Sequence, residues 1–494
     1  MHVDTHGGYL NLVTHHREAV IVASPTENRR IEVCNADATY DPVAFDMDDS
    51  CVPKGHRWYS FITSDEIRQR LAERPGFWGH YLEGAALRMQ YGQPERPIRG
   101  MRAVAASDIP CGAGLSSSTA LVLATLGALM HVNEVVWSPS ETILAARDSE
   151  WYAGARIGVS DQAAMVLGGR NRLYHAALYA EARSADSHEE PALEIRNSRH
   201  CELPGDMAIL VVNSRTRRHL SGAALVEYTQ NRFAYSMALE ILRQEMTRAG
   251  VDAEIANRYN RLSAFDVDGL GMIGGISKLY SLLTAVPRYI SVSQLECKYH
   301  LPRLNGLYMQ AFGMLPEQSR PTNINLRGPL LFGIAESERA RLFFGAAANR
   351  DWTAAGQWMS LGHDGDRRYD SLGLPWNWDC TDSLMEALQQ NATPLATCPG
   401  RYGASSRFLD GLVDAAMEAG ALGACLTGAG IAGSVIALVR AQEVNTVADC
   451  LRRTMASTEY AAWCGGQVPL ETADLADSVV VNHATEGLCA LQVP

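Results

Sequence analysis

Residues 110–120 read PCGAGLSSSTA, a run of glycines and serines directly ahead of an apolar segment. Glycine and serine are poor helix formers, so local stability does not account for this composition. Glycines let a ligand approach the main-chain N–H groups closely, and serine hydroxyls can donate to phosphate or bind Mg²⁺. A helix cap is the alternative, but one serine suffices for a cap. The sequence therefore favours a phosphate site made of Gly112, Gly114, Ser116, Ser117 and Ser118.

Two regular elements are expected to flank this loop. Residues 100–110 have the small and β-branched side chains of a strand, and residues 121–132 have the composition and length of a core helix. A helix that starts here presents unpaired N–H groups and the positive end of its dipole to the loop. No Gly-Lys-Ser/Thr follows the glycines, which excludes a Walker A loop.

A second glycine-rich stretch, residues 426–434, reads LTGAGIAGS and has the glycine spacing of a dinucleotide-binding loop. Such a loop needs a helix after the glycines, whereas the residues that follow, SVIALV, are mostly apolar and β-branched. A short apolar run, ACLT, precedes the glycines. The pattern therefore predicts a hairpin in an antiparallel sheet with helices on one face, and it excludes a Rossmann domain.

Composition narrows the class of protein. A chain of 494 residues exceeds the size of one hydrophobic core, which predicts two domains. The net charge is −12 and no basic cluster is present, so we expect no nucleic-acid partner. The 11 cysteines form no CxxC pair, which suits a reducing compartment. The longest apolar run, residues 120–132, is shorter than the roughly 20 residues of a membrane span, and no secretory signal opens the chain. We therefore predict a cytoplasmic protein without a membrane partner.

Several stretches resemble one enzyme family. GAGLSSSTA is similar to the second motif and LTGAGIAGS to the third motif of the GHMP kinases, the family of galactokinase, homoserine kinase and mevalonate kinase. Further matches, in family order, resemble the galactokinase branch: GVSDQ (158–162), VVNSRTRRHL (211–220), ESERARLFFGAAANRDW (336–352) and SLGHDGDR (360–367).

The resemblance implies an α+β GHMP kinase fold. An N-terminal ATP-binding domain similar to ribosomal protein S5 domain 2 would span residues 1–205, and a ferredoxin-like C-terminal domain would span residues 206–494. Substrate and ATP would bind between them. The segment near residues 245–325 matches no family motif and is expected to be helical.

The resemblance also implies ATP-dependent phosphorylation of a small alcohol. Phosphoryl transfer needs positioning, charge neutralisation and, in some enzymes, a carboxylate near the attacking hydroxyl. Asp161 in GVSDQ is the candidate base, with a surface-turn aspartate as the alternative reading, and Gly158 is a candidate substrate contact. Gly428 and Gly430 would join the first glycine loop in binding ATP.

A magnesium ion would accompany ATP in this family, held by hard oxygen ligands. Ser117 resembles the family's serine ligand, and Glu150 in RDSEWYAGA resembles its acidic ligand. Glu150 stands one residue nearer Gly154 than in most galactokinases, so Asp148 stays an alternative. A solvated helix carboxylate is the other reading for either residue.

The segment HVDTHGG (2–8) is similar to the galactokinase sequence His-Thr-Asp-Tyr-Asn-Gly-Gly. Under this match His2 and Asp4 would contact sugar hydroxyls. Tyr228, in GAALVEYTQNR, resembles the family's sugar-contacting tyrosine, with a helix-surface tyrosine as the alternative.

Three histidines, His6, His15 and His16, invite a reading as metal ligands. A tandem pair on a strand points to opposite faces, so His15 and His16 would not reach the same metal. We therefore predict no histidine metal site.

The resemblance predicts phosphorylation of galactose or a close relative at its anomeric hydroxyl. The family has a strand with Gly-Arg-Val-Asn ahead of HVDTHGG, whereas only Met1 precedes that segment here. We expect either that the start is assigned downstream of this strand, or that the protein is a catalytically silent sugar and ATP sensor of galactokinase ancestry. A GHMP kinase for another small alcohol is the third alternative.

Overall fold

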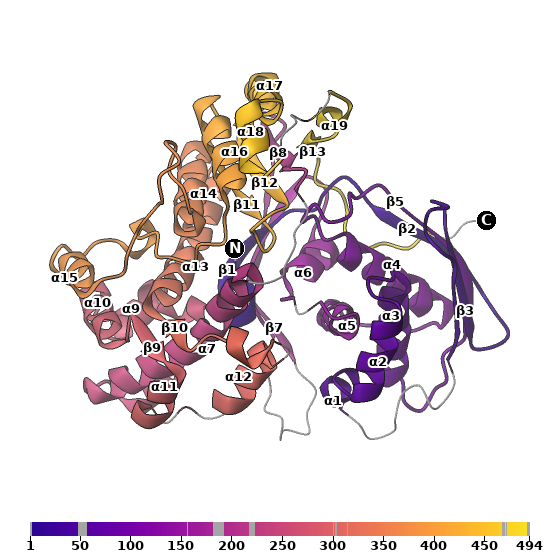
Figure 1. The fold of residues 1–494 in the computed structure, drawn as a ribbon, viewed down its shortest axis with the longest axis horizontal. Helices are drawn as coiled ribbons and strands as arrows, with labels where there is room; N and C mark the ends of the chain where they lie inside the picture. Colours follow the sequence, from indigo (N-terminus) through magenta and orange to yellow (C-terminus); the bar gives the residue numbers. More distant parts are fainter. Residues whose placement is uncertain are drawn as a thin grey trace. The chain divides into compact units, whose positions relative to one another are not determined.

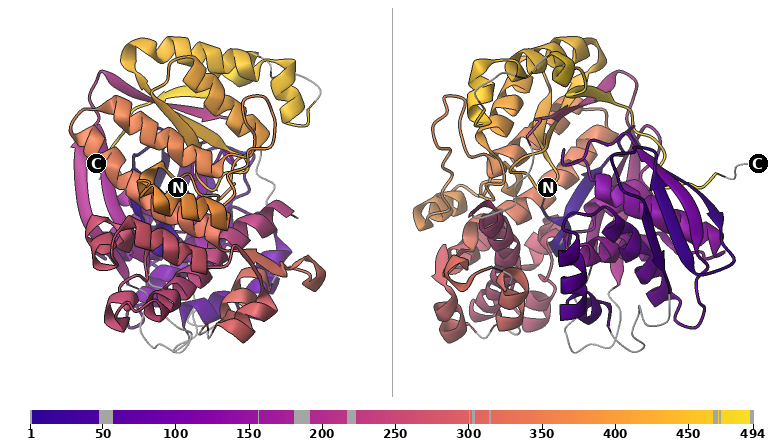
Figure 2. Two further views of the ribbon diagram at one scale, coloured as in Figure 1. Left: turned by 90° about the vertical axis from the view of Figure 1, so that its left-hand side faces the viewer. Right: turned by 45° about the vertical axis from the view of Figure 1, so that its right-hand side comes forward.

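The computed structural model describes residues 2–47, 57–155, 157–180, 192–216, 223–299, 301, 304–313, 315–466, 470 and 472–491. Contacts divide the chain into two compact units, drawn within Figures 1 and 2. Unit 1 comprises Met1–Asn11, His175–Tyr179 and Arg196–Asn482; unit 2 comprises Leu12–Tyr174, Ala180–Ile195 and His483–Pro494. Each unit is therefore built from three separate stretches of sequence. The predicted boundary after residue 205 separates two family domains and not these contact-based units. It therefore stays a prediction.

Unit 2 contains one four-stranded sheet. Its strands are β2 (Ala19–Pro25), β3 (Arg30–Asn35), β4 (Val43–Asp46) and β5 (Met101–Ser107). Their order is β2-β5-β3-β4, and β5 pairs antiparallel with β2 and parallel with β3. Residues alternate between buried and exposed along most of β5, so one face of the sheet packs against the core. β5 confirms the strand predicted before the glycine-serine loop.

The helices of unit 2 pack against the buried face of this sheet. Leu82, Leu126 and Ala146 lie in the same apolar cluster as the buried strand residues Ile31 and Met101. The helices in the described part of this unit are α1 (Trp58–Ile62), α2 (Asp65–Glu73), α3 (Gly79–Gly92), α4 (Ser117–Val132), α5 (Pro139–Tyr152) and α6 (Ser160–Leu167).

Unit 1 contains a four-stranded antiparallel sheet. Its strands are β8 (Met207–Asn213), β11 (Gly423–Thr427), β12 (Ser434–Arg440) and β13 (Val479–Asn482), in the order β11-β12-β8-β13. β11 and β12 form a hairpin in which Thr427 lies opposite Ser434, on either side of the second glycine-rich stretch. Their apolar side chains share a core with α16 (Arg407–Glu418) and α17 (Val444–Met455). The hairpin predicted over residues 426–434 is confirmed.

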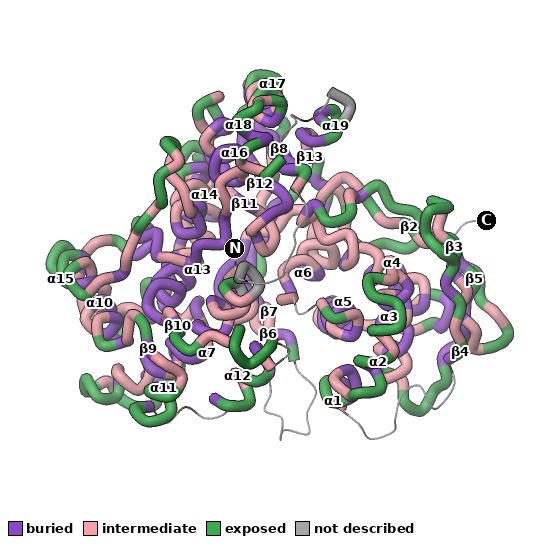
Figure 3. The backbone as a smooth tube through the Cα atoms, viewed as in Figure 1, coloured by how far each residue is buried: buried purple, intermediate pink, exposed green. Residues whose placement is uncertain are grey.

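The rest of unit 1 is largely helical. α7 (Ala223–Arg248) and α13 (Arg327–Ala348) are its longest helices, and Figure 3 shows how much of α13 is buried. The segment without a family motif is mostly helical, with one short antiparallel strand pair. Its elements are α8 (Ala253–Asn257), η2 (Leu262–Phe265), α9 (Val267–Met272), α10 (Ile276–Ala285), β9 (Tyr289–Ser291), α11 (Val292–Lys298), α12 (Leu304–Phe312), η3 (Glu317–Ser319) and β10 (Asn323–Asn325).

A third sheet has the order β1-β6-β7. Its strands are β1 (Tyr9–Leu12), β6 (Arg172–Ala180) and β7 (Leu193–Glu202). The remaining elements are η1 (Asp4–His6), α14 (Trp352–Asp366), α15 (Asp382–Gln390), η4 (Leu395–Thr397), η5 (Ala441–Glu443), α18 (Thr458–Trp463) and α19 (Thr472–Ala476). Across the described residues, the helices lack the combined length and hydropathy that a bilayer-spanning segment needs.

Candidate functional site

The glycine-serine loop adopts a backbone that its glycines permit. Gly112 and Gly114 have positive φ angles of 76° and 72°. α4 begins at Ser117, four residues earlier than the apolar segment starting at Leu121 suggested. Ser116 holds the N-cap position with a φ of 57°, yet its side chain makes no capping hydrogen bond. The serine run therefore does not act as an ordinary helix cap.

The Ser116 hydroxyl donates instead to Asp161. Its Oγ lies 2.6 Å from Oδ2 of Asp161. Asp161 occupies the first turn of α6, where the positive end of the helix dipole favours a carboxylate. Gly158 lies two residues before the start of this helix. The structure thus joins the predicted phosphate loop to the predicted base, although the two are 45 residues apart.

Glu150 lies fully buried near the end of α5 and accepts three hydrogen bonds. The donors are Ser118 Oγ at 2.8 Å, Thr119 Oγ1 at 2.8 Å and Gln162 Nε2 at 2.7 Å. Burial raises the pKa of the Glu150 carboxyl to about 7, against the opposing effect of the hydroxyl donors, and the charge of Asp161 contributes to the rise. A cation bound next to this buried carboxylate would therefore stabilise its ionised form.

Two residues of this cluster were not predicted from the sequence. Thr119 directly follows the serine run, and Gln162 directly follows Asp161 in GVSDQ. Both residues lie within the two quoted motifs, and this position was the sequence signal that could have identified them. Ser117 is the first residue of α4, between the two serines that reach Asp161 and Glu150.

Asp148, the alternative acidic ligand, has a different environment. Its Oδ1 lies 2.7 Å from Arg147 Nη2, and its Oδ2 lies 3.0 Å from Arg88 Nε. The side chain is buried, and two guanidinium groups already neutralise its charge. This arrangement favours Glu150 over Asp148 as a metal ligand.

The second glycine stretch forms the turn between β11 and β12. Gly428 and Gly430 have φ angles of 71° and 75°, and the non-glycine Ile431 also has a positive φ, 68°. The Ile431 amide donates to the Ala404 carbonyl oxygen at 2.6 Å. A Cβ atom on Gly430 would lie only 2.2 Å from that oxygen. The loop is therefore pressed against residue 404, and glycine is required at 430.

The N-terminal segment HVDTHGG lies within unit 1. The His2 ring stacks on Tyr402 with centroids 4.3 Å apart, and its Nε2 lies 3.4 Å from Oδ1 of Asp366. Asp4 is 8% exposed and opens η1. His6 Nε2 lies 2.9 Å from Ser236 Oγ on α7, and burial lowers the pKa of His6 to about 3. His6 is therefore neutral at physiological pH and ties this segment to α7.

The assumption that His15 and His16 lie on a strand was wrong. Both residues lie between β1 and β2 and not within a strand, and their rings stack with centroids 4.6 Å apart. Opposite faces of a strand therefore do not separate them. Among the described residues, no group of three or more histidine, cysteine, aspartate or glutamate side chains is arranged to hold a metal ion.

Tyr228 lies in α7, but its side chain is outside the part of the chain that the structure describes. The same holds for residues 217–220, the end of the VVNSRTRRHL match. These two predictions stay predictions.

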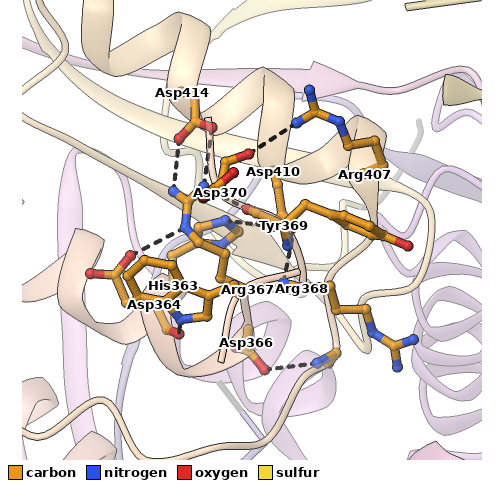
Figure 4. A network of polar contacts seen from close by, with 12 residues as sticks. His363, Asp364, Asp366, Arg367, Arg368, Tyr369, Asp370, Arg407, Asp410 and Asp414 are labelled. Atoms are coloured by element: carbon orange, nitrogen blue, oxygen red, sulfur yellow. Dashed lines mark hydrogen bonds and ion pairs between the residues drawn. The ribbon is translucent and has the colours of Figure 1, made fainter. Parts of the chain in front are cut away.

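The segment SLGHDGDR forms the end of α14 and anchors a polar network, shown in Figure 4. His363 and Asp410 are both fully buried, with Nε2 and Oδ1 3.2 Å apart. Asp410 Oδ2 also accepts the Arg368 and Tyr369 amides. Arg367 lies 2.8 Å from Asp414 Oδ1. The network fixes the chain where it leaves α14 towards the loop that follows.

Two family models match the chain, one in each half. The model described as GHMP kinases N terminal domain matches residues 80–169, which include the glycine-serine loop, Glu150 and Asp161. The model described as GHMP kinases C terminal matches residues 377–457, which include the second glycine stretch. The chain belongs to the GHMP kinases. Its fold is the α+β GHMP kinase fold, and as a kinase it is a phosphotransferase.

Similar proteins place this GHMP kinase near galactokinases. A galactokinase of Mycobacterium bovis is 24% identical over 385 residues, which are 78% of this chain and 76% of the relative. A galactokinase of Roseiflexus is 28% identical over 245 residues, 49% of this chain and 52% of the relative. The crystal structure of Lactococcus lactis galactokinase complexed with galactose has a TM-score of 0.58 at 17% identity, and the match covers 98% of this chain and 90% of that one. The chain is therefore a galactokinase-like GHMP kinase.

Proposed function

We propose that this GHMP kinase transfers the terminal phosphoryl group of ATP to the anomeric hydroxyl of a monosaccharide, galactose or a close relative. The observation that carries the proposal is the 2.6 Å hydrogen bond from Ser116 to Asp161. It places a carboxylate at the loop expected to hold phosphate. The names of the galactokinase relatives support a sugar as the acceptor.

Asp161 is the proposed general base. It would take the proton of the acceptor hydroxyl while that oxygen bonds to the terminal phosphorus and ADP departs. The Ser116 hydroxyl, which donates to Oδ2, would keep the carboxylate oriented. The base thus depends on a residue of the phosphate loop for its position.

The two glycine stretches are the proposed ATP-binding loops. In the first, the N-terminus of α4 supplies N–H groups and a favourable dipole for the phosphates of ATP. The contributing residues would be Gly112, Gly114, Ser116, Ser117 and Ser118 in that loop, with Gly428 and Gly430 in the second.

Magnesium fits the residues present. Glu150 is a fully buried carboxylate whose pKa is raised to about 7, so a cation beside it would relieve the cost of burying its charge. Glu150 and Ser117 are the proposed ligands, and the ion would neutralise phosphate charge when bound. Acceptor hydroxyls would be bound by His2, Asp4, Gly158 and Tyr228.

The test is a coupled assay of ADP release with galactose, arabinose, galacturonate and amino sugars, alongside calorimetry for sugar and ATP. We expect turnover with one sugar well above the rate of ATP hydrolysis without sugar. Binding of sugar and ATP without any turnover would reject the kinase proposal in favour of the sensor. Turnover with a non-sugar alcohol alone would favour another GHMP substrate.

A pH dependence should follow from Glu150. Because its pKa lies near 7 in the free protein, a proton competes with the metal at lower pH. We expect the KM for Mg·ATP to rise by up to about tenfold per pH unit below 7 and to level off above 8. Glu150→Gln should raise the KM above pH 7, approach the wild-type KM at low pH, where Glu150 is itself protonated, and flatten this slope. An equally steep slope in Glu150→Gln would contradict the assignment.

A further inference from the structure

The carboxylate of Asp366 lies in an electrostatically unfavourable position. It is the last residue of α14, next to the negative end of the helix dipole, and it is 2% exposed. The neighbouring Arg367 directs its guanidinium to Asp414 and Asp364. Helix stability therefore does not explain an aspartate here, and its contacts outside α14 do.

The first of these contacts is with the segment at residues 402–405. Tyr402 and Gly403 donate their amides to the Gly365 carbonyl at 2.8 and 3.0 Å. The Ala404 amide donates to Asp366 Oδ1 at 3.3 Å, and the Ser405 amide donates to the Asp366 carbonyl at 2.9 Å. Four successive N–H groups thus donate to the end of α14, so this segment is held in place.

The same segment, residues 402–405, contacts the second glycine stretch. Ala404 accepts the Ile431 amide at 2.6 Å, and Gly430 packs against the Ala404 carbonyl. A displacement of Ala404 would therefore move the loop that contains Gly428 and Gly430. Asp366 holds the same residue through the Ala404 amide N–H.

The second contact of Asp366 is with His2. Oδ1 of Asp366, the oxygen that accepts the Ala404 amide, lies 3.4 Å from His2 Nε2. The His2 ring is also stacked on Tyr402, nearly parallel at 8°. A single carboxylate oxygen therefore contacts both the segment expected to bind the acceptor and the segment that supports the second glycine loop.

We propose that Asp366 is a positioning residue that holds both the acceptor segment and the second glycine loop in place. The binding of both substrates therefore depends on it. This rests on the proposed function for the roles of His2 and of Gly428 and Gly430. Asp366 itself touches neither substrate in this scheme. Its effects pass through His2 on one side and through Ala404 on the other.

Two substitutions separate the two contacts. Asp366→Ala removes both, so we expect the KM values for the sugar and for ATP each to rise about tenfold, the effect of losing one close polar contact to a charged carboxylate. Asp366→Asn keeps an oxygen for the Ala404 amide but loses the charge facing His2. It should raise the sugar KM several-fold and leave the ATP KM within about twofold of wild type.

Asp364→Asn is the matched control. Asp364 lies on the same turn of α14, and its side chain contacts Arg367. It should leave both KM values within about twofold of wild type. Equal effects of Asp366→Asn on the two KM values, or no effect of Asp366→Asn on the sugar KM, would overturn the proposal even if Asp366→Ala fails to fold.

Hydrogen exchange provides a readout that does not need activity. Asp366→Ala should speed exchange of the Ile431 amide and of residues 2–8, whereas Asp364→Asn should not. If the wild-type protein phosphorylates no sugar, the proposed function is rejected. Hydrogen exchange would still test whether Asp366 holds the two segments in place. Unchanged exchange at Ile431 in a folded Asp366→Ala protein would overturn the inference.

Discussion

Replacing Asp161 by asparagine should lower kcat with the best sugar by about two orders of magnitude or more, with the KM for ATP nearly unchanged. Asparagine keeps the size of the side chain and an oxygen for the Ser116 hydroxyl, whose Oγ lies 2.6 Å away. It cannot accept a proton from the acceptor hydroxyl. Steady-state kinetics over sugar and ATP, with a thermal melt to confirm folding, provide the measurement.

Ser116→Ala is the companion variant. It removes the hydrogen bond to Asp161 but retains the carboxylate, so kcat should fall by only about three- to tenfold, the cost of a less well oriented base. Equal losses in the two variants would mean that the carboxylate acts through the loop and not as a base. Unchanged turnover in Asp161→Asn would place catalysis elsewhere.

Replacing Gly114 by valine should weaken ATP binding by about 100-fold or more. Gly114 has a φ of 72°, a left-handed conformation that a β-branched residue adopts only with strain of about 1–3 kcal/mol. The loop would relax away from it and withdraw N–H groups that bind phosphate. Losing one or two such charge-assisted hydrogen bonds accounts for the factor. Calorimetric titration with ATP provides the measurement.

Gly76→Val is a closely matched control for this strain. Gly76 has the same φ of 72°, and a Cβ there would meet no atom within 4 Å. It lies in the turn between α2 and α3, outside both glycine stretches. Gly76→Val should therefore lower the melting temperature without changing ATP affinity. Similar ATP binding by Gly114→Val and wild type would reject the loop as the phosphate site.

Local patterns in the sequence were sufficient for much of the fold. The β-branched run SVIALV after the second glycine stretch predicted a hairpin and not a Rossmann domain, and β11 and β12 pair accordingly. The strand before the glycine-serine loop was also predicted, as β5 shows. The start of α4 was placed too late, because Ser117, Ser118 and Thr119 have low helix propensity, whereas Ser118 and Thr119 are held there by hydrogen bonds to Glu150.

The distribution of charge in the site could not be read from the sequence. Asp148 and Glu150 lie two residues apart on α5, and spacing alone left both open as metal ligands. Arg88 on α3, 60 residues earlier, pairs with Asp148, whereas Glu150 meets hydroxyl and amide donors from α4 and α6. Likewise, treating His15 and His16 as strand residues was wrong, since they lie in the connection before β2.

The sequence by itself determined the features that depend on local backbone chemistry. Glycines at 112, 114, 428 and 430 permit positive φ angles, and the motifs around them identify the family. Only the tertiary structure decided which polar groups meet: Ser116 with Asp161, Glu150 with its three donors, and Asp366 with His2 and Ala404. These pairs join residues tens to hundreds of positions apart, so their contacts depend on how whole helices and turns pack, which no local pattern encodes.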